Sequence, residues 1–407
     1  MKCGLLGRKL GHSYSPQIHA LLGNYSYQLF EKEPEEIGDF LKNGDFTGLN
    51  VTIPYKKEVI PFLDELSPAA ARLGAVNTIV RRDGKLIGHN TDYFGFRRLV
   101  QESGLQVAGK KVLVLGSGGA SSTAVAVLQE LGAKVTVISR SGENNYENLD
   151  RHADAAVIAN TTPVGMYPNT GKSALSLDGF PQLEGVLDAV YNPARTQILL
   201  DAERRGLAAV NGLWMLVAQA KESAEWFTGE EIPDSRIAKI HHTLRLQMEN
   251  IILIGMPGCG KTAVGQQLAQ KLGKKFVDAD ESLEARVCRK ITDIIPNDGE
   301  AAFREMESET LAELGKQSGL VIATGGGCVT QPQNYPLLHQ NGTIFWLKRE
   351  LDKLPTDGRP LSQKGTLGQM YEARMPLYLR FADAAISNDG SIAETASAIC
   401  RKLEETT

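Results

Sequence analysis

The chain has 407 residues, of which 42% are apolar and 23% are charged, and its formal net charge at pH 7 is −4. This length exceeds one ordinary hydrophobic core and predicts two or three domains, and the composition argues against wholesale disorder. A slightly acidic chain is not a typical nucleic-acid binder, and no apolar run approaches the roughly 20 residues that cross a bilayer, so we expect neither nucleic acid nor membrane as a partner.

The five cysteines are scattered, odd in number and without a CxxC pair. This pattern is typical of reduced thiols, and the first 16 residues lack the long apolar segment of a secretory signal, so we expect a cytoplasmic protein. Cys259 is interpreted as a small residue that fills a tight turn. The pair His241 and His242 and the histidines outside the motifs have no metal-site spacing, and we expect solvated or capping roles for them.

The first hundred residues mix short strands with helices. We expect strands over residues 25–33 and 48–54, and a hairpin over residues 75–92 that turns at Asp83-Gly84. Asp-Gly between two alternating apolar runs is a strong hairpin signal.

Polar residues in this part recur at a spacing of two. The two pairs are Ser13 with Ser15, and Asn50 with Thr52. In an extended chain the members of such a pair face the same side, and we expect Val51 and Ile53 to turn toward the core. Polar groups on a shared face can bind a hydroxylated ligand.

Lys56 follows the second pair, and Asp92 is a candidate partner for it. A lysine beside a carboxylate and partly removed from water can transfer a proton while a hydride moves. Most single lysines are merely solvated, as we expect for Lys57. The assignment therefore depends on the combination of Lys56, Asp92 and the polar pairs.

The pattern changes at Lys110 to strands and helices that alternate. We expect a strand over residues 110–116, a helix over 121–132 and a second strand over 133–140. Further strands are expected over 155–162 and 185–191, and a helix over 213–228. A strand–helix–strand unit implies a parallel sheet.

The stretch "GSGGAS", residues 116–121, lies between the first strand and helix of this unit. Its glycines permit a sharp turn and let backbone N–H groups approach a pyrophosphate, although Ser121 replaces the third glycine of the usual fingerprint. The next strand ends at Arg140 and not at an acidic residue. An arginine there suits the extra phosphate of NADP, whereas Asp or Glu would hold the ribose of NAD; a solvated surface arginine is the alternative.

Residues 1–240 contain a series of motifs whose order is distinctive. They are "LGRKLGHSYSPQIHA", "NVTIPYK", "GAVNT", "NTD", "GSGGAS", "NTTPVGMYP" and "MLVAQA". This series resembles shikimate dehydrogenases and covers nearly a whole such enzyme. The resemblance implies NADP-linked reduction of the C3 ketone of 3-dehydroshikimate, with a substrate-binding lobe over residues 1–100, completed by helices around 213–240, and a Rossmann lobe over 101–212.

The resemblance also implies a role for each residue by its place in a motif. Lys56 and Asp92 would be the acid–base pair. The implied shikimate-binding residues are Ser13, Ser15, Asn50, Thr52, Lys56, Asn77, Asp92, Tyr191 and Gln219. The implied NADP-binding residues are Gly116, Ser117, Gly118, Gly119, Ala120, Ser121, Arg140 and Gly212. The chain departs from the family where Trp214 replaces a small residue, and we expect changed packing near the nicotinamide with activity preserved.

A second glycine-rich loop, G-x-x-x-x-G-K-T over residues 255–262, follows a strand over 251–255 and precedes a helix over 262–273. Both its spacing and its context are those of a P-loop. The backbone N–H groups of such a loop surround phosphates, Lys261 reaches the β and γ oxygens, and the Thr262 hydroxyl ligates magnesium.

The carboxylates and arginines that follow indicate the class of P-loop protein. A strand over 274–280 ends with Asp278 and Asp280, which we expect on one face, whereas a strand over 319–327 ends in three glycines without the usual terminal aspartate. Asp278 is therefore the natural magnesium ligand. Arg304 has Glu307 three residues along on the same helical face. Arg304 and Arg374 would clamp a carboxylate if the two side chains converge, although helical arginines are usually solvated.

The P-loop, the D-x-D pair and the motifs "GEAAFREME", "TGGG", "RPL" and "EARMPLY" resemble shikimate kinase from residue 248 to 407. The resemblance implies phosphorylation of the 3-hydroxyl of shikimate by ATP, with Asp280, Lys261 and the lid residue Arg359 as catalytic groups and Mg²⁺ held by Thr262 and Asp278. The implied ATP-binding residues are Gly258, Cys259, Gly260, Lys261, Thr262, Ala263 and Arg359. The implied shikimate-binding residues are Asp280, Arg304, Gly326 and Arg374. Lys353 would replace a second lid arginine.

Together the resemblances imply an α/β chain in which a two-lobed dehydrogenase is fused to a P-loop domain like that of nucleoside monophosphate kinases. It would make shikimate and then shikimate 3-phosphate on the route to chorismate and aromatic amino acids. Three alternatives remain: a nucleotide-dependent switch in the C-terminal half, a metabolite-sensing pseudo-enzyme in the N-terminal half, or a dehydrogenase that prefers quinate or NAD. The oligomeric state stays open.

Overall fold

The computed structural model describes residues 1–11, 13–354 and 367–405. Contacts divide the chain into two compact units. The first comprises Met1–Val164, Lys172–Tyr191 and Ile198–His242, and the second comprises Gly165–Gly171, Asn192–Gln197 and Thr243–Thr407. Helix α8 (Ser235–Met248) contains the point at which the chain passes from the first unit to the second. Among the described residues, no helix is long and apolar enough to cross a membrane.

The N-terminal lobe of the first unit is built on a six-stranded mixed sheet in the order β2-β1-β3-β5-β6-β4. Its strands are β1 (Lys2–Gly7), β2 (Ser26–Glu31), β3 (Gly48–Val51), β4 (Glu65–Leu66), β5 (Thr78–Arg82) and β6 (Lys85–His89), and its helices α1 (Ser15–Leu22), α2 (Ile37–Asn43) and α3 (Pro68–Leu73). The predicted hairpin is present as β5 and β6, which are antiparallel. Asp83 and Gly84 both have positive φ, as a two-residue hairpin turn of this kind requires.

The predicted strand over residues 48–54 is shorter than expected. Strand β3 ends at Val51, and the chain turns from Ile53. Val51 is buried as predicted, but the prediction for Ile53 is wrong because its side chain is 78% exposed. Alternation places side chains only while the chain stays extended, and here the strand ends before Ile53 is reached.

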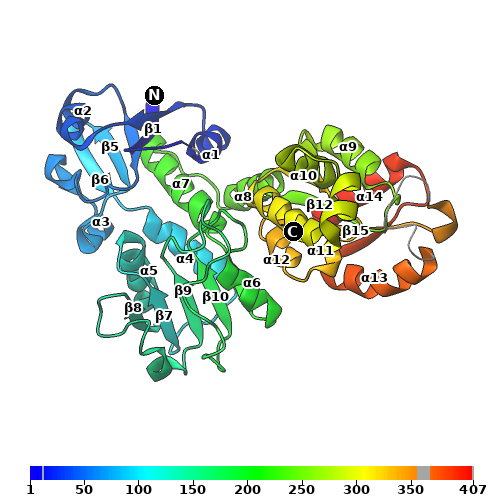
Figure 1. Ribbon diagram of the computed structural model, residues 1–407. Helices are drawn as coiled ribbons and strands as arrows, with labels where there is room; N and C mark the ends of the chain where they lie inside the picture. Colours follow the sequence, from blue (N-terminus) through cyan, green and yellow to red (C-terminus); the bar gives the residue numbers. More distant parts are fainter. Residues whose placement is uncertain (12, 355–366, 406–407) are drawn as a thin grey trace. The chain divides into compact units, whose positions relative to one another are not determined.

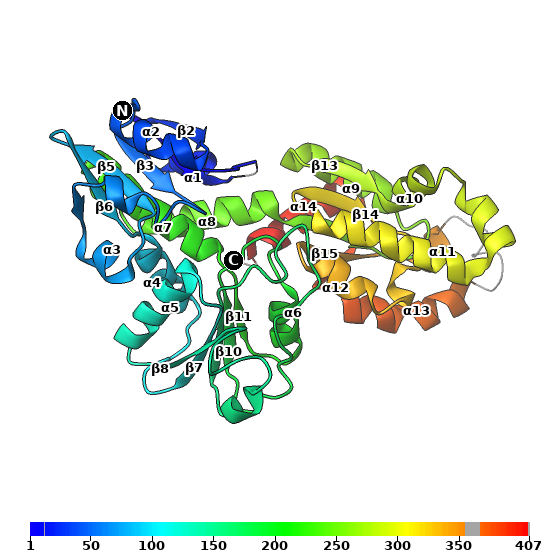
Figure 2. The same cartoon turned by 60° about the vertical axis from the view of Figure 1, so that its left-hand side comes forward.

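The second lobe of this unit has a five-stranded parallel sheet in the order β11-β10-β9-β7-β8. Its strands are β7 (Lys111–Leu115), β8 (Lys134–Ile138), β9 (Val157–Asn160), β10 (Gly185–Asp188) and β11 (Ala208–Val210), and its helices α4 (Asp92–Glu102), α5 (Gly119–Glu130) and α6 (Gln197–Arg204). Figure 2 shows α5 and α6 on opposite sides of this sheet. Alternate residues of β7 accordingly belong to two cores, Val112 and Val114 to one, and Leu113 and Leu115 to the other.

The strand order of this sheet reverses between β7 and β9, and ligands of open α/β sheets bind at the carboxyl ends of the strands at such a point. The predicted glycine turn follows β7 there. Helix α7 (Leu213–Thr228) has the predicted bounds and packs against α1, α4, β3 and β5, so it lies alongside the N-terminal lobe (Figure 1). It therefore carries its side chains to the boundary between the two lobes.

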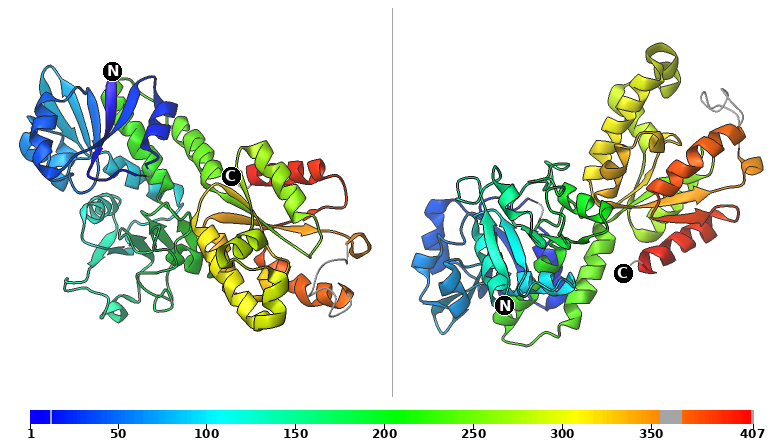
Figure 3. Two further views of the ribbon diagram at one scale, coloured as in Figure 1. Left: turned by 45° about the horizontal axis from the view of Figure 1, so that its top comes forward. Right: turned by 90° about the horizontal axis from the view of Figure 1, so that it is seen from below.

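The second unit has its own five-stranded parallel sheet in the order β13-β14-β12-β15-β16. Its strands are β12 (Asn250–Ile254), β13 (Lys275–Asp278), β14 (Leu320–Ala323), β15 (Gly342–Lys348) and β16 (Ala384–Ser387). Its helices are α9 (Lys261–Leu272), α10 (Ala279–Val287), α11 (Ile291–Lys316), α12 (Asn334–His339), α13 (Leu367–Phe381) and α14 (Ile392–Glu405). Helices α9 and α14 cover one face of the sheet, and α11, α12 and α13 cover the other (Figure 1 and Figure 3).

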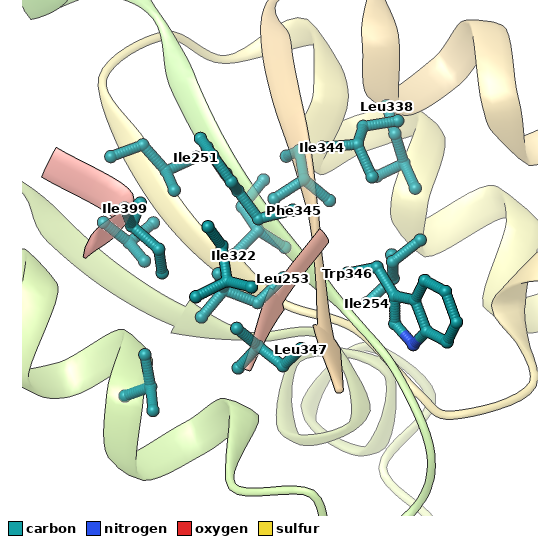
Figure 4. Packing of buried hydrophobic residues seen from close by; sticks show 14 of the residues in the cluster. Ile251, Leu253, Ile254, Ile322, Leu338, Ile344, Phe345, Trp346, Leu347 and Ile399 are labelled. Carbon is teal, nitrogen blue, oxygen red and sulfur yellow. The ribbon is translucent and has the colours of Figure 1, made fainter. Parts of the chain in front are cut away.

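The core of the second unit lies on both faces of this sheet. Figure 4 shows Ile399 of α14 near Ile251 on one side, and Leu338 of α12 against Ile344 of β15 on the other. The central strand β12 is buried along its whole length, as expected for a parallel sheet covered on two faces. The glycine loop after β12 is therefore anchored by the most protected strand of the unit.

Replacing Leu253 of β12 by alanine should lower the free energy of unfolding of the second unit by about 2–5 kcal/mol, because its fully buried side chain would leave a cavity. The exposed Leu379 is a matched control, and its replacement by alanine should change stability by less than about 0.5 kcal/mol. Urea unfolding followed by tryptophan fluorescence measures both, in a chain whose first-unit residues Trp214 and Trp226 are replaced by phenylalanine so that Trp346 of this core gives the signal. Equal losses in the two variants would contradict the assignment of the core.

Candidate active sites

The first candidate site is a cavity of about 240 Å³ in the first unit, where the N-terminal lobe meets the carboxyl ends of the second lobe's strands. The structure brings to it all nine residues predicted to bind shikimate: Ser13, Ser15, Asn50, Thr52, Lys56, Asn77, Asp92, Tyr191 and Gln219. The remaining lining residues are Leu5, Val51, Ala189, Gly212, Met215 and Leu216. Residues separated by two hundred positions thus converge on one polar cavity.

Lys56 and Asp92 form an ion pair in this cavity, with 2.6 Å between Nζ of Lys56 and Oδ2 of Asp92. The side chains are 28% and 13% exposed, so both are largely withdrawn from water but can still be reached from the cavity. Asp92 is the first residue of α4, where the helix dipole favours a carboxylate. The pair can hold a proton at Nζ and deliver it to a ligand oxygen.

A buried hydroxyl cluster lies behind the cavity wall. Oγ of Ser223 in α7 lies 2.8 Å from Oγ1 of Thr78 and 2.9 Å from Oγ1 of Thr91. The same hydroxyl accepts a hydrogen bond from Nδ2 of Asn50 at 2.8 Å and donates to the Gln219 carbonyl at 2.9 Å. Ser223 is fully buried. One hydroxyl therefore ties β3, β5, α4 and α7 together directly behind the predicted substrate-binding side chains.

The sequence analysis missed this cluster. Thr78 and Thr91 lie within the quoted motifs "GAVNT" and "NTD". Ser223 lies one helical turn after Gln219, which is the signal that could have identified it. The cluster also fixes how Asn50 can act. Its Nδ2 donates to Ser223 and Thr78 and its Oδ1 accepts from Tyr27 at 2.7 Å, so it offers a ligand the second lone pair of Oδ1.

Ser13 and Ser15 reach the cavity by a route that differs from the expected one. They do not lie on an extended strand: Ser15 is the first residue of α1, and its backbone N–H donates to Oγ of Ser13 at 3.2 Å. The prediction of a shared strand face is wrong for this pair because Pro16 follows and opens a helix. Both hydroxyls nevertheless lie beside the N-terminus of α1, which favours an anionic ligand.

The glycine turn after β7 has the geometry that a pyrophosphate needs. Gly116 has φ of 111°, and Oγ of the buried Ser121 donates to its carbonyl at 2.7 Å, so Ser121 closes the turn from inside. The space beside Gly118 and Gly119 is open, and α5 begins there without a side-chain cap. The first N–H groups of α5 are thus available to a phosphate, and the residues fit a dinucleotide.

The other predicted dinucleotide residues flank this turn. Ser117 is exposed and Ala120 is half-buried beside it. Arg140 lies two residues beyond the end of β8 and is exposed. Gly212 lines the substrate cavity, and a Cβ there would lie 2.1 Å from the Ala189 carbonyl oxygen, which explains why glycine occupies the position.

Trp214 does not form a wall of the substrate cavity. Its ring stacks on His241 of α8, with 3.7 Å between ring centroids and 8° between planes. The departure from the family pattern at Trp214 is therefore accommodated by His241, and the expectation of changed packing beside the nicotinamide stays a prediction. The expectation of a solvated or capping His241 is wrong for the same reason.

Four further histidines among the described residues are also not solvated. His19, His89, His152 and His339 are buried, and three of them stack on aromatic rings: His19 on Tyr27, His89 on Trp226, and His339 on Tyr335. Burial lowers the pKa of His19 to about 3 and that of His89 to about 4. Both imidazoles are neutral at pH 7, so neither competes with the Lys56–Asp92 pair for the proton-transfer role.

The second candidate site is a cavity of about 600 Å³ in the second unit, at the carboxyl end of its sheet. Its lining includes the predicted residues Gly258, Gly260, Lys261, Thr262, Ala263, Asp278, Asp280, Arg304, Gly326 and Arg374. The side chain of Cys259 is fully buried beneath the loop, as predicted for a small residue in a tight turn. Arg359 lies outside the described residues.

The loop from Gly255 to Lys261 has the backbone of a phosphate cradle. Gly258 and Gly260 have φ of 82° and 97°, and α9 begins at Lys261 without a side-chain cap. Nζ of Lys261 donates to the carbonyls of Gly255 and Met256 at 2.9 and 3.1 Å. In this arrangement the ammonium lies under the loop, and it must turn outward to meet a phosphate.

A residue that the sequence analysis missed, directly after the end of β16, supports this loop. Nδ2 of Asn388 donates to the Cys259 carbonyl at 2.6 Å, and Oγ1 of Thr395 donates to Oδ1 of Asn388 at 2.7 Å. Nδ2 of Asn388 also lies 2.6 Å from the place that a Cβ on Gly260 would occupy. Asn388 follows the loop by more than a hundred positions, so no local pattern indicates it.

Thr262 and Asp278, the predicted magnesium ligands, are in direct contact. Oγ1 of Thr262 donates to Oδ2 of Asp278 at 2.9 Å, and Oδ1 of Asp278 accepts the backbone N–H of Asp280 at 3.0 Å. Hydroxyl and carboxylate oxygens are ligands that Mg²⁺ prefers, and this ion usually keeps several waters and phosphate oxygens. The pair Thr262 and Asp278 fits this mode of binding.

The prediction that Asp278 and Asp280 share one face of a strand is wrong. Asp278 ends β13 and caps α10, while Asp280 lies in the first turn of that helix. Burial raises the pKa of Asp280 to about 6, and the nearby carboxylates of Asp278 and Glu307 add to this shift. The positive charges of Lys261 and Arg304 oppose it. The pKa of the Asp280 carboxyl therefore lies closer to neutral pH than that of an ordinary aspartate, in the range that suits a general base.

Gly325 allows two carboxylates to approach each other. A Cβ on Gly325 would lie 2.6 Å from Oε1 of Glu307 and 2.8 Å from Oδ1 of Asp280. Burial also raises the pKa of Glu307, and Arg304 opposes this shift. Any side chain at Gly325 would collide with both acidic groups, which explains the glycine after β14.

The two predicted arginines line the same cavity from different helices. Arg304 of α11 pairs with Glu307 at 2.8 Å, which confirms the predicted helical neighbour, and with Glu300 at 3.1 Å. Nη1 of Arg374 in α13 donates to the Gly326 carbonyl at 3.1 Å. Arg304 is only 6% exposed, so it is not a solvated surface arginine. Two guanidinium groups in one cavity can clamp a carboxylate.

Lys353, the residue considered as a replacement for a second lid arginine, is 41% exposed and pairs with Glu350 at 2.7 Å. It also lies 3.9 Å from Asp389. Two acidic neighbours thus hold its ammonium.

The two sites define the chain as an oxidoreductase with a dinucleotide site joined to a P-loop kinase. The family model for the shikimate dehydrogenase substrate-binding domain matches residues 5–79, and that for shikimate kinase matches residues 257–404. The NADP(+) shikimate dehydrogenase of Clostridium perfringens strain SM101 is 37% identical over 264 residues, covering 60% of this chain and 97% of that protein.

Solved structures give the same result. Shikimate dehydrogenase 1 of Peptoclostridium difficile is 38% identical with a TM-score of 0.55, covering 60% of this chain and 98% of that one. A chorismate mutase/shikimate 5-dehydrogenase fusion protein from Clostridium acetobutylicum is 36% identical with a TM-score of 0.57, covering 60% and 96%. The chain belongs to the shikimate dehydrogenase family, and its C-terminal part carries a shikimate kinase domain.

Replacing Ser223 by alanine should raise the KM of the dehydrogenase for its substrate about 5- to 20-fold, because Asn50, Thr78 and Thr91 lose their shared partner and the cavity wall loosens. The kinase rate of the same chain, measured in parallel, is the control because its cavity contains none of these residues. An unchanged KM in a correctly folded variant would show that the cluster does not support the site.

Proposed function

We propose that the chain catalyses two successive reactions: NADPH-dependent reduction of 3-dehydroshikimate to shikimate, then ATP-dependent phosphorylation of shikimate to shikimate 3-phosphate. The observation that carries this proposal is that each unit contains a separate cavity with its own machinery. One holds the Lys56–Asp92 pair, and the other holds a P-loop, Asp280 and two arginines. The substrates are small molecules of the route to chorismate and aromatic amino acids.

In the reductase, NADPH supplies the hydride. Lys56 provides the proton that the ketone oxygen gains, and Asp92 stabilises the charged ammonium before transfer. Ser13 and Ser15, beside the N-terminus of α1, are placed to hold the substrate carboxylate. Oδ1 of Asn50 accepts from a substrate hydroxyl, since its amide nitrogen is already committed.

Further residues complete this substrate site. Thr52, Asn77, Tyr191 and Gln219 offer the remaining polar contacts along the cavity wall. The open turn over Gly116–Gly119, with Ser117, Ala120 and Ser121, holds the pyrophosphate. Arg140 is placed to pair with the 2′-phosphate of NADP at the end of β8.

In the kinase, magnesium supplies charge neutralisation at the transferred phosphate. Thr262 and Asp278 would hold the ion, and Lys261 turns out to meet the phosphate oxygens. Gly258, Gly260 and the backbone of Cys259 and Ala263 surround the phosphates, and Arg359 is proposed to close over them.

Substrate binding in the kinase depends on opposite charges at two ends of the cavity. Arg304 and Arg374 bind the shikimate carboxylate, and Gly326 contributes its backbone. Asp280 accepts the proton of the 3-hydroxyl as that oxygen attacks the γ-phosphate. A nucleotide-dependent switch would need neither the two arginines nor Asp280, and a metabolite sensor would not need the Lys56–Asp92 pair.

The site of action is proposed to be the cytoplasm. All five cysteines are free thiols, which agrees with a reducing compartment.

The direct test supplies the purified chain with 3-dehydroshikimate, NADPH, ATP and magnesium. We expect one NADPH oxidised and one ADP formed for each shikimate 3-phosphate, measured by absorbance and by mass spectrometry. Initial rates with NAD in place of NADP, and with quinate for the reverse reaction, test the remaining alternatives. A chain that oxidises no NADPH and forms no ADP would refute the proposal.

Lys56→Ala and Lys261→Ala should each abolish one activity and spare the other. Removing the Lys56 ammonium should lower the reductase kcat by about 10²–10⁴-fold, because the proton donor is lost. Lys261→Ala should lower only the kinase rate, by at least about 10²-fold, because a phosphate contact is lost. The two rates are measured on each variant, and loss of both rates in either folded variant would contradict independent sites.

The kinase kcat/KM should rise with pH through about 6, because the pKa of Asp280 is raised to about 6 and only its ionised form accepts the hydroxyl proton. Below this value the rate should fall about tenfold per pH unit. The profile is measured with limiting shikimate at constant ionic strength. Asp280→Asn should be slow and should lack this limb; a wild-type rate that is flat through pH 6 would contradict the role.

A further inference from the structure

The carbonyl of Gly326, in the loop after β14, receives two hydrogen bonds from α13. The hydroxyl of Tyr378 donates to it at 2.5 Å, and Nη1 of Arg374 donates to it at 3.1 Å. Tyr378 and Arg374 are one helical turn apart, so they approach the carbonyl from the same face of α13. Arg374 lines the kinase cavity, whereas Tyr378 is fully buried behind it.

The Tyr378 ring is held in place by the core. It stacks on Trp346 of β15, with 5.6 Å between ring centroids, and its hydroxyl also lies 3.8 Å from Sδ of Met256. On the other side of the peptide, a Cβ on Gly326 would lie 2.6 Å from the Pro257 ring. The Gly326 peptide is thus fixed between the P-loop and α13, and the hydroxyl of Tyr378 has little freedom to leave it.

Arg374 has a second task that competes with this hydrogen bond. In the proposed kinase its guanidinium binds the substrate carboxylate together with Arg304. A buried carbonyl left without a donor is costly, and a bond from a charged donor is stronger than one from a neutral donor. If Arg374 were the sole partner of the Gly326 carbonyl, substrate binding would have to break that bond without replacement.

We propose that Tyr378 is a positioning residue of the kinase, whose hydroxyl satisfies the Gly326 carbonyl and so leaves the Arg374 guanidinium free to bind the substrate carboxylate. This inference rests on the proposed shikimate kinase function. It predicts that Tyr378 affects the binding of shikimate and not the binding of ATP or the transfer step. The residue acts through Arg374 and touches no reacting atom.

The test is Tyr378→Phe in the full chain, which removes one oxygen from an otherwise unchanged ring. We expect the KM for shikimate to rise about tenfold, because the freed carbonyl holds Arg374 back, while kcat and the KM for ATP stay within about twofold. Tyr371→Phe, on the same helix and half-buried, is the matched control and should change none of these constants. The dehydrogenase rate of each variant reports the amount of chain in the assay, and an unchanged KM for ATP shows that the second unit is folded.

A second substrate separates positioning from general packing. The primary amide of shikimate lacks the carboxylate that Arg374 binds, so its KM should be nearly the same in wild type and Tyr378→Phe. Equal KM changes for shikimate and its amide, or a KM for ATP that rises in parallel, would overturn the inference, as would an unchanged KM for shikimate. If the wild-type chain forms no shikimate 3-phosphate, the proposed function itself fails, and this inference fails with it.

Discussion

A helix that begins directly after a glycine turn leaves its first backbone N–H groups without side-chain partners, and both sites of this chain depend on that condition. Helix α5 begins after Gly118 and helix α9 after Gly260, and neither has a side-chain cap. The unpaired donors and the helix dipole favour an anion at the carboxyl edge of a parallel sheet. Each sheet then determines which other groups can reach that anion, because its neighbouring strands end at the same edge.

The groups that do the chemistry are supported by residues from distant parts of the chain. Ser223 lies behind Asn50 and the threonines, and Asn388 holds the Cys259 carbonyl at the P-loop. Such supports are buried and hydrogen-bonded, so they fix rotamers that cavity residues alone could not keep. The side chains that line the cavities remain partly exposed, so a ligand can reach them, while the supporting residues behind them are buried.

Local patterns predicted what local forces determine. Asp83-Gly84 gave the hairpin turn, and the spacing of Arg304 and Glu307 gave an ion pair within one helix. The predictions failed where an element ends, as at Ile53 and Asp280, because alternation contains no information on the last extended residue. They also failed for histidines such as His241, whose aromatic partner is distant in the sequence. Supports such as Asn388 depend on tertiary contacts and leave no local signal.

The two sites use opposite electrostatic arrangements, which follow from their chemistry. In the reductase, Lys56 and Asp92 neutralise each other before the reaction, so the ammonium stays charged in a largely buried position until its proton moves. In the kinase, Asp280 and Glu307 are crowded together and offset by Lys261, Arg304 and an incoming cation, which keeps one carboxylate basic. Joining the units in one chain gives equal numbers of the two units and raises the local concentration of the intermediate. Linkage alone supplies that gain, so neither site has to be altered to serve the other.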